Sequence, residues 1–131
     1  MVLIPLCFTI VPDYHFESSK LPFDRAKDLC QASGMHISSV MSLAENTKIW
    51  LESKKLGSEF LWLGARDVEG DGSWRWIDGE SFTFKRWSIK DDKEDKANGA
   101  HYLAMSAGTG FWHQVSKFHL LPSVCENIGK F

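Results

Sequence analysis

The sequence predicts one α+β domain, with two helices in the first half of the chain and short strands in the second. Residues 21–57 carry apolar side chains at helical spacing. From Phe60 onward the apolar residues are bulky and are punctuated by Gly, Asp and Asn. The 131 residues are 44% hydrophobic, which is enough for one sizeable core and too little for two ordinary domains. We therefore expect a single domain over residues 1–131, with helices beside an antiparallel sheet.

The N-terminal segment 2–11 is apolar and is predicted to form the first strand. It has no basic flank and no small-residue cleavage site, and it is far shorter than the ~20 residues that a spanning helix needs. Apolar and polar residues alternate on both sides of the Pro12–Asp13 turn, which is typical of a hairpin. We expect a terminal hairpin and no membrane span in this chain.

The first helix is predicted to have Pro22 in its first turn and to stop at Gly34. Phe23, Ala26 and Cys30 recur at helical spacing, so they fall on one face of this helix. That face is expected to pack in the core.

The second helix has a Ser42-x-x-Glu45 capping box at its start and Gly57 at its end. The residues that supply its apolar positions are Leu43, Ile49, Trp50 and Leu56. Residues 36–40, between the two helices, are predicted to be a short connecting segment.

The second half of the chain is predicted to form strands separated by turns. Turns are predicted at residues 69–72 and at Asp78–Gly79 because Gly and Asp cluster there. The bulky residues expected to lie in the strands around them are Trp62, Trp74, Trp76, Phe82, Phe84 and Trp87. Three final strands are predicted near residues 102–105, 111–112 and 120–125.

Charge and motif content exclude several classes of function. Fifteen basic and seventeen acidic residues give a net charge of -2, and they are mixed along the chain, so nucleic-acid binding is not expected. The sequence has no Gly-x-Ser-x-Gly motif and no phosphate-binding glycine loop, and we expect no enzymatic activity. His101, His113 and His119 match no metal-ligand spacing, so no metal site is predicted from them.

The three cysteines leave one without a partner. The count alone leaves two interpretations of Cys30 and Cys125 open: a disulfide in an oxidising compartment, or two buried thiols in a cytosolic core. A bridge would close a loop of about 95 residues and would stabilise the fold by roughly 4–5 kcal/mol. Cys7 is expected to be buried in the first strand, with an intermolecular bridge that forms a dimer as the second interpretation.

Short motifs follow one another in a specific order from the first helix to the last strand. They comprise Phe23, Ala26, Cys30, Gly34, Glu45, Trp62–Ala65, Trp76, Asp78–Gly79, Trp87, Gly110–Trp112 and Val124–Glu126. In order and spacing this set resembles the C-type lectin-like domain over essentially the whole chain. The resemblance implies two helices flanking short antiparallel sheets with a long upper loop region. It also implies a Cys30–Cys125 disulfide and a secreted or extracellular recognition module.

The resemblance also identifies where this chain departs from calcium-dependent relatives. Those relatives hold sugar through a calcium ion bound by a Glu-Pro-Asn or Gln-Pro-Asp triplet, a further Glu and an Asn-Asp pair after a Trp. Calcium needs six to eight hard oxygen ligands. Here the loop contains Asp91-Asp92-Lys93, and Trp112 is followed by His113 and Gln114. A second family disulfide is also missing, because its positions correspond to His101 and Lys117.

The accessory calcium site of the family is only partly retained. Asp67 and Asp71 match acidic positions of that site, and Glu94 matches a third, whereas Gly99 and Ala100 stand where carboxylates belong. No cofactor is therefore expected, apart from a weak structural calcium ion near Asp67 and Asp71. The alternative interpretation is that these acids are ordinary solvated loop charges.

We predict that the domain binds a glycan or glycoconjugate without the usual calcium bridge. The predicted ligand-binding residues are Asp91, Asp92, Lys93, Glu94, Asp95, His113 and Gln114. Trp62, Trp76 and Trp112 are expected to lie in the core, because large aromatic side chains dominate cores, whereas Trp74 and Trp87, if exposed, are the candidates for stacking on a sugar. One alternative is a protein-binding receptor ectodomain or secreted inhibitor that uses the same face on a cell-surface or secreted protein. Another is a structural matrix or mineral-associated protein.

Overall fold

The computed structural model describes residues 13–89 and 101–127. Within these ranges, no helix has the length and apolar character needed to cross a membrane. The predicted strand over 2–11, Cys7, and the loop residues Asp91 to Asp95 lie outside the described residues.

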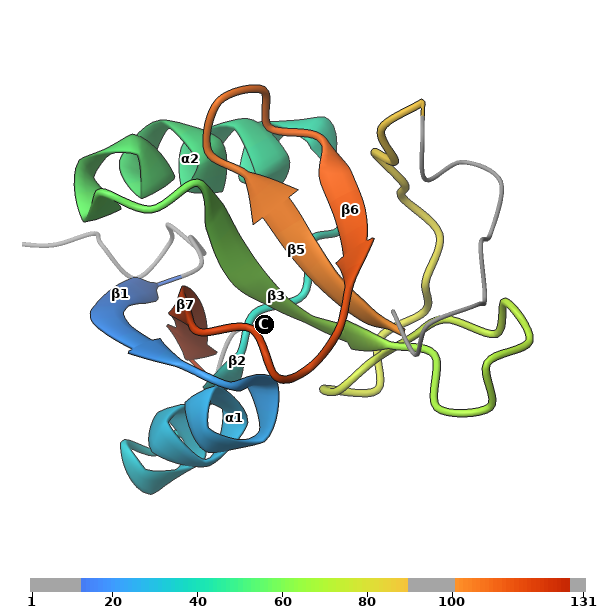
Figure 1. Cartoon of the computed structure of the whole chain (residues 1–131), viewed down its shortest axis with the longest axis horizontal. Helices are drawn as coiled ribbons and strands as arrows, with labels where there is room; N and C mark the ends of the chain where they lie inside the picture. Colours follow the sequence, from blue (N-terminus) through green and yellow to red (C-terminus); the bar gives the residue numbers. More distant parts are fainter. Residues whose placement is uncertain (1–12, 90–100, 128–131) are drawn as a thin grey trace, which may run out of the picture.

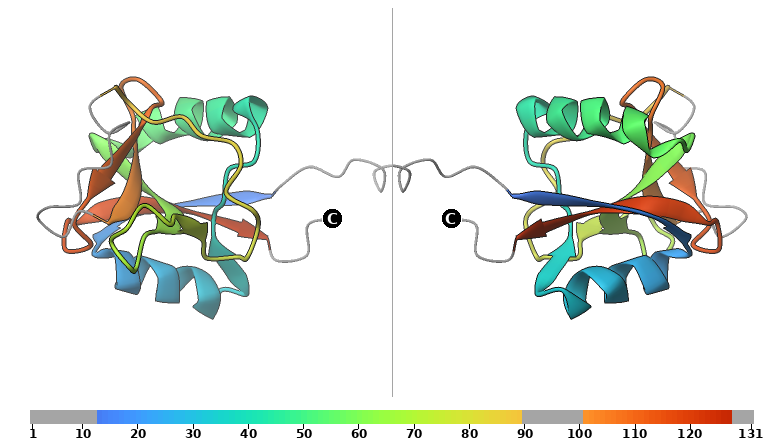
Figure 2. Two further views of the ribbon diagram at one scale, coloured as in Figure 1. Left: turned by 90° about the vertical axis from the view of Figure 1, so that its right-hand side faces the viewer. Right: turned by 90° about the vertical axis from the view of Figure 1, so that its left-hand side faces the viewer.

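Two α-helices, one 3-10 helix and seven strands make up the described fold (Figure 1). In chain order they are β1 (Tyr14–Leu21), α1 (Phe23–Ala32), β2 (Met35–Ile37), α2 (Leu43–Ser53), η2 (Lys54–Leu56), β3 (Phe60–Arg66), β4 (Arg75–Trp76), β5 (Tyr102–Ser106), β6 (Trp112–Val115) and β7 (Leu121–Asn127). Helices α1 and α2 lie on opposite sides of the sheet (Figure 2). The predicted α+β class is therefore correct.

The strands form one sheet in the order β1-β7-β3-β5-β6, with β2 paired to β7 and β4 paired to β3. Almost every pairing is antiparallel, as expected. Strands β3 and β7 are the exception, since they run parallel where Trp62 meets Ser123. The predicted antiparallel pairing therefore holds for the other strand pairs, and the one parallel bridge arises because the chain returns to the centre of the sheet for its last strand.

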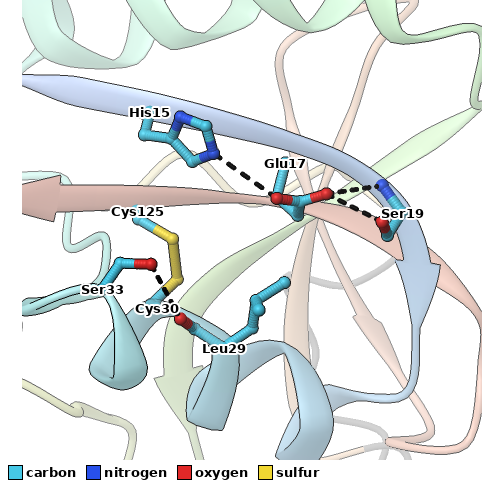
Figure 3. Close-up of polar contacts among 7 residues, drawn as sticks. All are labelled: His15, Glu17, Ser19, Leu29, Cys30, Ser33 and Cys125. Carbon is cyan, nitrogen blue, oxygen red and sulfur yellow. Dashed lines mark hydrogen bonds and ion pairs between the residues drawn. A yellow bond between two sulfur atoms is a disulfide. The ribbon is translucent and has the colours of Figure 1, made fainter.

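Helix α1 ends as its sequence predicts, but it begins at Phe23, so Pro22 is the N-cap and not a residue of the first turn. Pro22 precedes it with φ -69°, and Gly34 follows with φ 76°, a left-handed value that favours glycine. Phe23, Ala26 and Cys30 are fully buried. Cys30 forms a disulfide with Cys125 of β7 across 5.5 Å between Cα atoms, which joins the helix to the sheet (Figure 3).

Strand β1 pairs with β7 through an irregularity between Glu17 and Leu21. At this irregularity the Glu17 carboxylate accepts hydrogen bonds from the Ser19 hydroxyl at 2.8 Å and the Ser19 backbone N–H at 3.1 Å (Figure 3). These bonds, together with the nearby His15 ring, lower the pKa of Glu17. The described partner of β1 is β7, and the other arm of the predicted hairpin lies outside the described residues.

Helix α2 has the predicted cap at Ser42, whose hydroxyl accepts a hydrogen bond from the Glu45 N–H at 3.1 Å. The reciprocal bond runs to the Glu45 carboxylate from the Met41 N–H at 3.0 Å, one residue earlier than in the usual capping box. Leu43 is 51% exposed, so this apolar position of the helix lies at the surface. A 3-10 turn follows the helix and ends at Gly57, which has φ 67°.

The predicted connecting segment 36–40 contains part of a strand. Strand β2 pairs with β7, and Ile37 lies opposite Cys125. Immediately after it, Ser38 accepts a backbone hydrogen bond from the Gly64 N–H at 2.8 Å. A Cβ on Gly64 would lie 2.5 Å from the Ile37 carbonyl oxygen, so only glycine permits this approach. This segment is therefore part of the sheet and is buried, and it does more than connect the two helices.

The core has two parts, one on each face of the sheet. On the α2 side it is built around Leu61, Leu63, Leu103 and Trp112, and on the α1 side around Phe23, Trp62 and the disulfide. The predicted burial of Trp62, Trp76 and Trp112 is confirmed. Aromatic side chains supply much of the apolar area in both parts.

Several aromatic residues predicted to lie in strands occupy irregular backbone. Phe82, Phe84 and Trp87 belong to the segment after β4, and only Trp87 forms a bridge, to Trp112. They are half-buried and pack on the α2-side core without a strand partner of their own. Bulky residues therefore indicated burial correctly but not backbone conformation. The turns predicted at 69–72 and Asp78–Gly79 and the three final strands are confirmed.

Candidate functional site

The start of β6 is anchored to α2 through one buried amide. The Asn46 Oδ1 accepts a hydrogen bond from the Trp112 indole N–H at 2.8 Å, and the Asn46 Nδ2 donates to the Gly110 carbonyl at 3.0 Å. Asn46 is 3% exposed. Because both bonds are buried, they hold the residues that precede His113 in one position.

The turn before β6 is held in the same way by Trp50. Its indole N–H donates to the Ala107 carbonyl at 2.9 Å. Gly110 has φ 80°, and a Cβ there would lie 3.0 Å from the Trp50 ring. The predicted binding strand therefore starts from a rigid support on α2.

His113 and Gln114 lie on opposite faces of β6. His113 pairs with Ala104 and Gln114 with Leu103, and consecutive strand residues point to opposite sides of a sheet. The His113 ring packs edge-on against Phe60 with centroids 5.2 Å apart on the α1 side. A ligand that contacts both predicted residues must therefore reach around β6, which is the last strand in the order of the sheet.

The segment before the charged loop runs beside β6. The Trp112 N–H donates to the Arg86 carbonyl at 2.8 Å, and the Ser88 N–H donates to the Trp112 carbonyl at 2.9 Å. The Ser88 hydroxyl lies 3.4 Å from the His113 Nδ1. Ser88, His113 and Gln114 all make further interactions. The structure thus brings the start of the loop next to the two β6 residues, whereas Asp91 to Asp95 lie outside the described residues.

Asp67 organises the turn that follows β3. Asp67 is 2% exposed, and its carboxylate accepts hydrogen bonds from the Gly70 N–H at 3.1 Å and the Gly72 N–H at 2.7 Å. Asp71 accepts one from the Ser73 N–H at 3.0 Å. Each carboxylate oxygen of Asp67 therefore has a backbone partner, which gives this residue a structural role whether or not an ion binds.

Three potential metal ligands meet elsewhere, at the β2–β7 end of the sheet. Ligand atoms of His36, Asp78 and Glu126 all lie within 4.8 Å of one another, and this is the one such group of three among the described residues. His36 Nδ1 is 3.8 Å from Asp78 Oδ2, and the Ser38 hydroxyl donates to the Glu126 carboxylate at 3.2 Å. Imidazole and carboxylate are ligands that suit zinc and similar cations.

The sequence did not single out this group. His36 lies in the segment between the two helices, and Asp78 and Glu126 belong to two separate motifs. The three residues lie on β2, on the turn after β4, and on β7. Only the pairing of β2 with β7 brings His36 opposite Glu126, and no local spacing could have indicated that contact.

Tyr14 lies beside this group of three residues, because it pairs with Glu126 from the β1 side of the sheet. Its hydroxyl is buried and has no hydrogen-bond partner in the described part of the chain. Burial, and then the carboxylates of Glu45 and Glu126, raise the pKa of Tyr14 well above its usual range. The phenol therefore stays neutral over the physiological range of pH.

The two candidate stacking residues belong to an aromatic cluster. Trp74 lies 4.9 Å from Trp87 between ring centroids and stacks on Phe82 at 6.3 Å. Both tryptophans are half-buried. A hollow of about 290 Å³ opens beside Trp74 and Phe82, with Glu80 at its wall. Trp74 therefore keeps a face beside open space.

Comparison with known proteins supports this description. The chain is 29% identical over 114 residues to human C-type lectin domain family 17, member A, a match that covers 86% of this chain and 29% of that protein. It is 26% identical over 117 residues to the hepatic lectin of Gallus gallus, covering 86% and 53%. The chain thus spans about a third to a half of the length of these relatives.

Solved structures share the fold. The carbohydrate-recognition domain of the mouse scavenger receptor C-type lectin superposes with a TM-score of 0.78 and 25% identity, covering 88% of this chain and 87% of that chain. Domains of this kind are generally binding modules without enzymatic activity. Residues 19–127 match the lectin C-type domain, and the chain therefore belongs to the C-type lectin domain family.

Proposed function

We propose that this domain is a secreted or extracellular recognition module that binds a glycan or glycoconjugate without a bridging calcium ion. The observation that supports glycan binding is the match to the lectin C-type domain over residues 19–127. The solved carbohydrate-recognition domain with the same fold supports the same ligand class.

The proposed binding face is the outer part of β6 together with the charged loop that precedes β5. His113 and Gln114 contribute from the strand. From the loop the proposal includes Asp91, Asp92, Lys93, Glu94 and Asp95. Carboxylates and amides are suited to the hydroxyl groups of a sugar, because they accept and donate hydrogen bonds directionally.

Independence from calcium is argued from the residues after Trp112. In calcium-dependent relatives an Asn-Asp pair supplies oxygen ligands there. Here the first position is His113, whose ring packs on Phe60 and whose Nδ1 is 3.4 Å from the Ser88 hydroxyl. An imidazole nitrogen is a poor ligand for a hard cation. A weak structural calcium ion near Asp67 and Asp71 is a separate proposal, which calcium titration tests.

The experiment is a glycan-array profile of the folded protein, recorded with calcium and with a chelator. We expect specific binding that survives chelation and weakens in Gln114→Ala and His113→Ala. Lys48→Gln, on the exposed side of α2, serves as the control and should leave binding unchanged. Binding lost on chelation would contradict calcium independence. No binding in either condition would contradict the glycan ligand and favour a protein ligand.

A further inference from the structure

Two arginines face each other across the short β3–β4 ladder. Arg66 pairs directly with Arg75, and the neighbouring pair is Ala65 with Trp76. Ala65 and Trp76 are buried in the α2-side core. Because side chains alternate along a strand, Arg66 and Arg75 both point to the opposite, α1 side of the sheet.

These two positive charges have no acidic partner in residues 13–89 and 101–127. Among the described residues, neither guanidinium forms an ion pair with a carboxylate. Like charges placed directly opposite each other on a sheet are destabilising. The pair therefore brings two positive charges close together, and an anion between them would offset the repulsion of the two guanidinium groups.

A hollow of about 310 Å³ lies against this arginine pair. Its lining includes Arg66, Val68, Glu69, Ser73, Arg75 and Ile77. Its volume lies in the range of small-ligand sites. The Ser73 hydroxyl adds a hydrogen-bond donor. The turn that carries Ser73 is stabilised by the hydrogen bonds from the Gly70 and Gly72 N–H groups to the Asp67 carboxylate.

We propose that this hollow, here called the arginine hollow, binds an anionic group on a glycan: a sulfate ester or a carboxylate. The inference rests on the proposed glycan-binding function and specifies the chemical class of the ligand. A guanidinium is a planar fork that donates two parallel hydrogen bonds to such a group. Two guanidinium groups on one face can hold it from both sides.

The surroundings of the arginine hollow suit a sugar that carries the anion. Arg75 and Trp76 also line the second hollow beside Trp74 and Phe82. The aromatic face belongs to the α2-side cluster and the arginines point to the α1 side, so a sugar ring stacked on Trp74 brings its acidic substituent to the arginines only by reaching around β4. Glu69 lies at the edge of the arginine hollow and opposes the anion, so it weakens binding.

The test uses three probes: sulfated N-acetylglucosamine, glucuronic acid and neutral N-acetylglucosamine. Binding is measured by calorimetry and by NMR of the arginine side-chain Nε–H signals. We expect the acidic probes to shift the Arg66 and Arg75 signals and to bind more weakly as salt is raised. The two acidic probes show whether sulfate or carboxylate is preferred.

The variants distinguish the contribution of positive charge to binding from that of the planar guanidinium geometry. Arg66→Gln with Arg75→Gln should weaken binding of the acidic probes at least tenfold. The same pair changed to lysine should restore part of the affinity, because lysine keeps the charge and loses the fork. Glu69→Gln should strengthen binding. Lys48→Gln with Lys55→Gln removes two exposed charges from the α2–η2 segment and should have no effect.

The outcomes distinguish this inference from the proposed function. Neutral and acidic glycans bound equally by wild type and by the glutamine variant would overturn the arginine hollow and leave glycan binding intact. Acidic probes that shift the arginine signals while no glycan binds at β6 would support the hollow and contradict the proposed β6 face. Unperturbed arginine signals with every probe would overturn the inference.

Discussion

Asn46 on α2 and Trp112 on β6 form a buried hydrogen bond of 2.8 Å that joins the helix to the outermost strand of the sheet. The same amide binds the Gly110 carbonyl. The proposed binding strand therefore depends on a residue that contacts no ligand, because Asn46 fixes where β6 begins.

Replacing Asn46 with alanine should lower the free energy of unfolding by about 2–4 kcal/mol, because it leaves the Trp112 N–H and the Gly110 carbonyl buried without partners. Urea denaturation measures the change. Asn127→Ala, which removes an exposed bond to Asp13, is the control and should cost less than about 1 kcal/mol. Equal effects of the two variants would show that the Asn46 bonds have no special role.

Gly64→Ala should destabilise the fold by about 3 kcal/mol or more, because the new Cβ would clash with backbone atoms of Ile37 that cannot move alone. Gly108→Ala is a matched control, since its Cβ would meet only the Ser106 hydroxyl at 3.6 Å. Thermal and urea unfolding of both variants check this. A Gly64→Ala protein as stable as wild type would mean that β2 and β3 do not approach each other so closely.

Removing the disulfide with Cys30→Ala and Cys125→Ala should cost roughly 4–5 kcal/mol, because the bridge closes a loop of 95 residues in the unfolded chain. Intact-mass analysis without reduction should show two hydrogens fewer than the all-thiol mass. Peptide mapping should find Cys30 linked to Cys125. Alkylation of both cysteines without prior reduction would contradict the bridge.

Tyr14 should make the fold sensitive to alkaline pH. Its pKa is higher in the folded protein than in the unfolded chain, so its contribution is fully present below about pH 10 and is lost as the pH rises further. The free energy of unfolding should fall by at most about 1.4 kcal/mol per pH unit from this group.

Tyr14→Phe should remove that part of the slope and change stability little at pH 7, because the hydroxyl has no hydrogen-bond partner among the described residues. Urea denaturation from pH 7 to pH 11 measures both effects. Identical pH profiles for the two proteins would show that Tyr14 titrates normally.

Local signals in the sequence determined the helices and their limits. Pro22, Gly34 and Gly57 act through their own backbone preferences, and the Ser42 cap acts within one helical turn, so none of them needs a distant partner. Burial of Trp62 and Trp112 was predictable for a similar reason, since large apolar side chains enter the core of almost any compact fold. The resemblance to the C-type lectin-like domain added the Cys30–Cys125 pairing.

Other features depend on strand register, which no local pattern specifies. The approach of Gly64 to Ile37, the meeting of His36 with Asp78 and Glu126, and the separation of His113 from Gln114 onto two faces all arise from pairings between distant segments. Leu43 is a further example of what a local pattern does not specify. Its side chain is apolar, but the packing of α2 leaves it exposed.

By itself, the sequence determined the fold class, the helix limits and, through family resemblance, the kind of domain. Only the tertiary structure decided which side chains share a face, as with Arg66 and Arg75. The physical reason is that propensity and capping act over a few residues. A binding surface, by contrast, is assembled by sheet register and packing, which bring together residues from far apart in the chain.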